Sequence, residues 1–168
     1  MFNKIEKLSK SEFAEVFGNI FENASWIAEK LYMQKPFKNF DDLSSKMISI
    51  FEHTNNQNKL NILNSHPDLA DKAKIGSLTP DSYREQSKAG LDQCNEKEFN
   101  EFKNLNLKYK NKFGFPFIIA VKQKNKLEIL VSFKKRILFE KKDEFDEAIK
   151  QVKKIASLRL DELKIKFL

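Results

Sequence analysis

One histidine and a group of three polar residues have the types and spacing to do chemistry. His66 stands directly before Pro67, and Ser82, Glu85 and Gln86 follow further along the chain. Side chains three and four positions apart share one face of a helix, so these three can point at one spot. A histidine has an unperturbed pKa of about 6.5, and it therefore moves protons readily near pH 7. A histidine close to a carboxylate would suit general acid–base catalysis.

The neighbouring residues indicate which elements must position these side chains. A helix is expected to begin at Thr79, whose hydroxyl can cap it, with Pro80 at the first helical position and Asp81 in the first turn. Gly90 supplies the stop. A residue before proline is pushed away from helical geometry, so His66 is expected where the preceding helix ends, with its side chain facing a cleft.

The remaining chain predicts further amphipathic helices. Ser9 with Glu12, and Asn95 with Glu98, have the spacing of capping boxes, and another helix is expected to begin at Asp41 or Asp42. Apolar residues recur at helical intervals, and they include Trp26, Ile27, Leu31, Tyr32, Leu43, Met47, Ile50, Phe51, Leu127, Leu130, Val131, Ile137, Phe145, Ile149, Val152, Ile155 and Ala156.

The apolar run FPFIIAV at 115–121 is too short for its periodicity to distinguish a strand from buried extended chain. It has no clear partner strand. The sequence therefore predicts an all-α, multi-helix bundle.

Composition favours one helical domain over residues 1–168. The chain holds only 4 glycines and 4 prolines, with 40% hydrophobic and 33% charged residues, and no Gly/Ser/Pro-rich linker divides it. Cys94 is the single cysteine and cannot form an internal disulfide, which favours a reducing compartment. The sequence shows neither a signal peptide nor a membrane-spanning apolar run, so we expect a cytoplasmic protein without membrane association.

The net charge of +7 leaves open one alternative class of function, a basic binding module. A basic helical module could bind nucleic acid or a partner protein through its lysines. The lysines are, however, interleaved with acids along the chain, which is typical of a solvated surface. The sequence also lacks Cys/His clusters with metal spacing and glycine-rich phosphate loops, which disfavours metallohydrolase and nucleotide-binding functions.

Several motifs together resemble one family. HPDLA at 66–70, S-x-x-E-Q-x-x-A-G-L-D at 82–92 and KFGFPFIIAV at 112–121 occur in the order found in the 2-oxo-4-hydroxy-4-carboxy-5-ureidoimidazoline (OHCU) decarboxylases of urate breakdown. FENASWIAEKLYMQKPF at 21–37 and KIASLRL at 154–160 extend the resemblance over nearly the whole chain.

The resemblance implies a cofactor-free decarboxylation that yields S-allantoin, with no metal, and a homodimer acting on a small ureidoimidazoline. It assigns the catalytic pair to His66 and Glu85. Asp71 departs from the family pattern, where a glycine is common, and this departure concerns the loop geometry. A family relative that acts on a different ureido acid is a separate alternative that stays open. The substrate-binding positions implied are Pro67, Ser82, Gln86, Phe117, Ile118, Ile119, Ala120, Val121 and Arg159.

Overall fold

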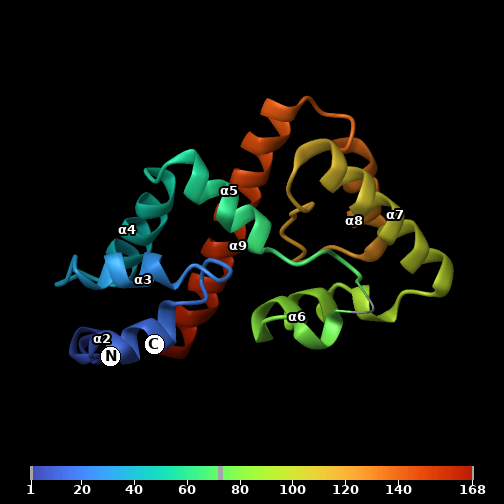
Figure 1. Cartoon of the computed structure of the whole chain (residues 1–168). Helices are drawn as coiled ribbons and strands as arrows, with labels where there is room; N and C mark the ends of the chain where they lie inside the picture. Colours follow the sequence, from blue (N-terminus) through green and yellow to red (C-terminus); the bar gives the residue numbers. More distant parts are fainter. Residues whose placement is uncertain (1, 72–73, 168) are drawn as a thin grey trace. The chain divides into compact units, whose positions relative to one another are not determined.

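The computed structural model describes residues 2–71 and 74–167, and over these ranges it contains helices and no strand (Figure 1). The predicted all-α fold is therefore confirmed. The helices are α1 (Asn3–Lys7), α2 (Lys10–Phe17), α3 (Ser25–Tyr32), α4 (Phe40–Glu52), α5 (Asn56–Ser65), α6 (Pro80–Lys88), α7 (Glu96–Phe113), α8 (Lys126–Arg136) and α9 (Lys141–Phe167), with 3₁₀ turns at Ile75–Ser77 and Leu91–Gln93.

The chain divides into two compact units. The first comprises Met1–Ser65 with Val152–Leu168, and the second comprises His66–Gln151. Within the first unit, α2 packs on α3 and α3 packs on α4. Helix α9 begins in the second unit and ends in the first. A single domain over residues 1–168 stays a prediction.

Local capping chemistry determines where several helices begin. The capping boxes expected at Ser9–Glu12 and Asn95–Glu98 are both present, and a third, at Asn125–Glu128, begins α8. The predicted start of α4 was wrong by one to two residues. Asn39 Oδ1 accepts a hydrogen bond from the amide of Asp42 at 2.8 Å, so the helix begins at Phe40.

The buried face of α8 differs in part from the predicted one: Leu130 is buried as expected, but two other residues of the predicted stripe are not. Leu127 and Val131 are 69% and 61% exposed, whereas Ile129 and Phe133 are fully buried. Phe133 stacks on Phe117 with ring centroids 3.9 Å apart, and this large contact decides which face of the helix turns inward. Two other aromatic residues expected in the core, Trp26 and Tyr32, are only half-buried.

The FPFIIAV segment is buried extended chain. Its backbone bonds to side chains instead of to a neighbouring strand: the Arg136 guanidinium donates to the Ile118 carbonyl at 2.7 Å, and the Ala120 amide donates to Gln151 Oε1 at 3.0 Å. Buried backbone groups need such partners, so these side chains allow the segment to remain irregular inside the core.

A buried ionic cluster supports this segment. Arg136 pairs with Glu144, whose carboxylate also accepts a hydrogen bond from the Tyr109 hydroxyl. The Arg136 guanidinium carbon lies 4.5 Å from the centroid of the Phe117 ring. Burial, reinforced by the hydrogen bond to Glu144, raises the pKa of Tyr109, so the phenol remains a donor. The cluster thus joins α7, α8 and α9, and through Arg136 it contacts the FPFIIAV segment.

Candidate active site

His66 lies directly after α5, which ends at Ser65, as the sequence predicted. Its side chain is half-buried, and it belongs to the second unit. The loop that it opens continues through Pro67 to Ala70. Ala70 has a φ of +52°, a left-handed conformation that a non-glycine residue holds only when its surroundings impose it.

Helix α6 carries three of the predicted site residues, Ser82, Glu85 and Gln86. Thr79 Oγ1 accepts from the Ser82 amide at 3.3 Å, and Pro80 occupies the first turn, as expected. Gly90, with a φ of +76°, follows the helix end. Ser82 and Gln86 are 5% and 4% exposed, respectively. Their burial, with Glu85 half-buried beside them, shows that this polar face of α6 turns inward.

Gln86 connects this face to the histidine loop. Its amide oxygen accepts from the Ala70 N–H at 3.1 Å, and its amide nitrogen donates to the Asp68 carbonyl at 3.2 Å. Gln86 therefore brings α6 against the loop that carries His66. The buried residues Phe117, Ile118, Ile119, Ala120 and Val121 belong to the same unit.

Arg159 lies in the first unit, on the C-terminal part of α9. Its guanidinium donates at 3.0 Å both to the Asn19 carbonyl and to Glu22 Oε2. The side chains of Arg159 and Glu22 are 4% and 1% exposed, so the ion pair is almost completely buried. A role for Arg159 in substrate binding stays a prediction.

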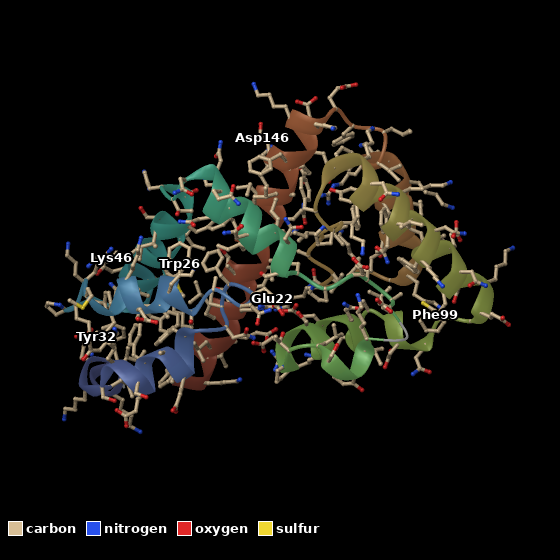
Figure 2. All side chains as sticks on the ribbon, in the orientation of Figure 1. Glu22, Trp26, Tyr32, Lys46, Phe99 and Asp146 are labelled. Carbon is tan, nitrogen blue, oxygen red and sulfur yellow. The ribbon has the colours of Figure 1, made fainter. Side chains whose placement is uncertain are left out.

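Sequence reasoning missed Glu22. It stands between the buried residues Phe21 and Ala24 on the connection from α2 to α3, where Figure 2 labels it. Its backbone carbonyl accepts from the Ser65 hydroxyl at 2.7 Å, and Ser65 directly precedes His66. Glu22 thus connects Arg159 to the residue before the histidine. An acid that directly follows the apolar residues Ile20 and Phe21 was the only signal available in the sequence.

We expect Glu22→Gln to lower the free energy of unfolding by about 1–3 kcal/mol, because the amide cannot neutralise the buried Arg159 guanidinium. Urea denaturation followed by circular dichroism would measure the change. Glu29→Gln is the matched control, since that acid is about half exposed in its ion pair with Lys10. Equal stability of the two variants would contradict a structural role for the buried pair.

The described residues also bear on metal, membrane and thiol sites. No group of three or more metal-ligating side chains occurs among residues 2–71 and 74–167. In the same described ranges, no helix combines the length and apolarity that crossing a bilayer requires. Cys94 is buried, and burial raises the pKa of its thiol, which disfavours a nucleophilic thiolate.

Sequence relatives match this chain over most of its length. It is 34% identical over 161 residues to the 2-oxo-4-hydroxy-4-carboxy-5-ureidoimidazoline decarboxylase of Halalkalicoccus jeotgali, covering 96% of this chain and 90% of that protein. It is 39% identical to the uric acid degradation bifunctional protein of Bacillus sp. (strain TB-90), covering 95% of this chain but only 31% of the longer protein.

Two solved structures resemble this fold. A crystal structure of (S)-allantoin synthase has a TM-score of 0.75 at 28% identity, and the match covers 97% of this chain and 54% of that one. A crystal structure of OHCU decarboxylase in the presence of (S)-allantoin has a TM-score of 0.70 at 25% identity, covering 93% and 98%. The family model for OHCU decarboxylase matches residues 6–161. The chain therefore belongs to the OHCU decarboxylase family.

Proposed function

We propose that this chain is a carboxy-lyase that converts OHCU to S-allantoin in urate catabolism. Family membership supports the reaction, and one geometric observation supports its location. Gln86 holds the loop of His66 against the face of α6 that carries Glu85. A proton-transfer group and a carboxylate are therefore presented from two adjoining elements of one unit.

The proposed reaction breaks the bond between the substrate carboxylate and the ring carbon that bears the hydroxyl. Carbon dioxide leaves, and the electron pair is delocalised into the ring. A proton must then be added to one face of the ring system. In this proposal His66 handles the proton transfers and Glu85 orients the imidazole, a type of catalysis that contributes about 10²–10⁴-fold to rate.

Binding groups would hold the substrate in the reactive orientation. We assign Ser82 and Gln86 to its polar ring and ureido groups, Pro67 to the wall beside the histidine, and Arg159 to its anionic edge. A guanidinium suits a planar two-pronged contact with a carboxylate. The backbone of 117–121 would supply further fixed donors and acceptors. Such orientation converts binding into reactive geometry.

Circular dichroism of the product tests the function. Uncatalysed protonation of the planar intermediate occurs on both faces and yields racemic allantoin, whereas an enzyme delivers the proton to one face. Protein added to freshly generated OHCU should therefore produce the S-allantoin signal, and a blank without enzyme should not. A folded protein that behaves like the blank would overturn the assignment and favour an altered substrate.

We also propose a cytoplasmic location and a homodimer, and the family resemblance supports the homodimer. We propose this assembly together with the function, and analytical ultracentrifugation of the purified chain would test it. A sedimentation coefficient corresponding to the 19.7 kDa monomer at all concentrations would contradict the dimer.

A further inference from the structure

A buried amide occupies the apolar face of α7. Asn106 is 5% exposed and lies between Phe102 and Tyr109, one helical turn away on either side and both fully buried. An amide among apolar side chains is unfavourable unless it makes hydrogen bonds. Asn106 Nδ2 donates to the Leu69 carbonyl at 2.9 Å, so the contact that accounts for its position is with the histidine loop.

The loop after His66 is held from two helices. Residues 68–70 make hydrogen bonds with Gln86 on α6 and with two side chains of α7, so three consecutive residues are held. The four contacts are Gln86 Nε2 to the Asp68 carbonyl at 3.2 Å, Lys110 Nζ to Asp68 Oδ2 at 2.6 Å, Asn106 Nδ2 to the Leu69 carbonyl at 2.9 Å and the Ala70 amide to Gln86 Oε1 at 3.1 Å.

Pro67 couples the conformation of the held residues 68–70 to that of His66. Its ring limits its own φ to about −65°, and its bulk restricts the backbone of His66. With only Pro67 between His66 and Asp68, holding the Asp68 carbonyl and carboxylate limits the directions in which the His66 side chain can leave the backbone. The left-handed Ala70 at the far end would relax if these contacts were lost.

We propose that Asn106 is a positioning residue for His66, and that the Lys110–Asp68 ion pair assists it from the next turn of α7. The contact holds the loop in the conformation that places the imidazole for proton transfer. Its kinetic consequence rests on the proposed function, but its effect on the imidazole environment does not.

Asn106→Leu is a suitable test because the fold should accept it. Within the described part of the chain, Asn106 Oδ1 is a buried acceptor without a hydrogen-bond partner, so the substitution removes an unsatisfied group along with the donor. Leucine has the same length and branching as asparagine, and a groove of about 460 Å³, lined by Asn106, Ala70 and Lys110 among others, leaves room for its slightly larger methyl groups. Asn104→Leu, at an exposed position of the same helix, is the matched control.

Nuclear magnetic resonance of the histidine rings provides a readout independent of turnover. The chain has only two histidines, and His53 belongs to the first unit and is exposed. We expect Asn106→Leu to shift or broaden the His66 ring resonances and leave those of His53 unchanged. Asn104→Leu should change neither. Unchanged His66 resonances in a folded Asn106→Leu protein would overturn the proposal.

The kinetic readout separates positioning from simple loss of protein. Asn106→Leu should lower kcat by about 10- to 100-fold and change KM by less than about twofold, because the misplaced imidazole affects the reacting geometry more than ground-state binding. Unchanged kcat would contradict positioning. If wild-type protein has no OHCU decarboxylase activity but the His66 resonances still move, the function fails while the positioning contact stands.

A second variant covers the case in which Asn106→Leu does not fold. Lys110 is 40% exposed, so Lys110→Met removes the ion pair with Asp68 while keeping the apolar stem. It should move the His66 resonances in the same direction by a smaller amount. Lys108→Met, at an exposed lysine of the same helix, is its control. Equal His66 spectra in both lysine variants would overturn the assistance assigned to Lys110.

Discussion

His66→Ala is expected to lower the rate of S-allantoin formation by about 10²–10⁴-fold while leaving the fold intact. The substitution removes the only histidine at the end of α5, and with it the group assigned to proton transfer. Because the side chain is half-buried and follows a helix end, its loss creates little cavity in the core. Product circular dichroism measures the rate, and far-ultraviolet circular dichroism checks the fold.

His53→Ala is the matched control for this experiment. His53 is the other histidine of the chain, is exposed, and contacts the Ser49 carbonyl through Nδ1 at 2.9 Å. It should retain wild-type activity. If His66→Ala retained most of the wild-type rate, the catalytic assignment of the histidine loop would be wrong.

Glu144→Ala is expected to lower the free energy of unfolding by about 3–5 kcal/mol, because it leaves a buried guanidinium without its counter-ion. Glu144 is 0% exposed, and it binds both Arg136 and Tyr109. Since Arg136 also holds the Ile118 carbonyl, the FPFIIAV segment should loosen as well. Urea denaturation followed by circular dichroism gives the free energy.

Two further variants make this measurement specific. Asp146→Ala removes an exposed acid from the same helix, where Figure 2 labels it, and should change stability little. Tyr109→Phe removes one hydrogen bond and keeps the ion pair, so it should cost about 1–3 kcal/mol. A Glu144→Ala protein as stable as Asp146→Ala would show that the buried cluster is not needed for stability.

Short-range chemistry in the sequence was sufficient to predict where several helices begin. Ser9 caps α2 and Asn95 caps α7, and Thr79 with Pro80 begins α6, because these effects operate within one helical turn. The shared polar face of α6 follows from the helical repeat alone. The position of His66 at the end of α5 follows from the proline after it.

The apolar pattern did not predict which face of a helix is buried where both faces carry apolar residues. Leu127 and Val131 fit a helical stripe in α8 as well as Ile129 does, yet they are exposed. The stacking of Phe133 on Phe117 selected the buried face. Tertiary contacts also explain why the FPFIIAV segment is irregular, because side chains from α8 and α9 bind its backbone in place of a neighbouring strand.

The sequence by itself determined the helices, the polar face of α6 and, through its motifs, the family and the candidate catalytic pair. The tertiary structure alone decided which residues distant in the sequence contact one another. Glu22 pairs with Arg159, Asn106 donates to the Leu69 carbonyl, and Glu144 pairs with Arg136. The physical reason is the sequence separation over which each kind of interaction acts. Capping and helical spacing join residues a few positions apart, whereas a buried charge or amide is satisfied by whichever group folding brings to it.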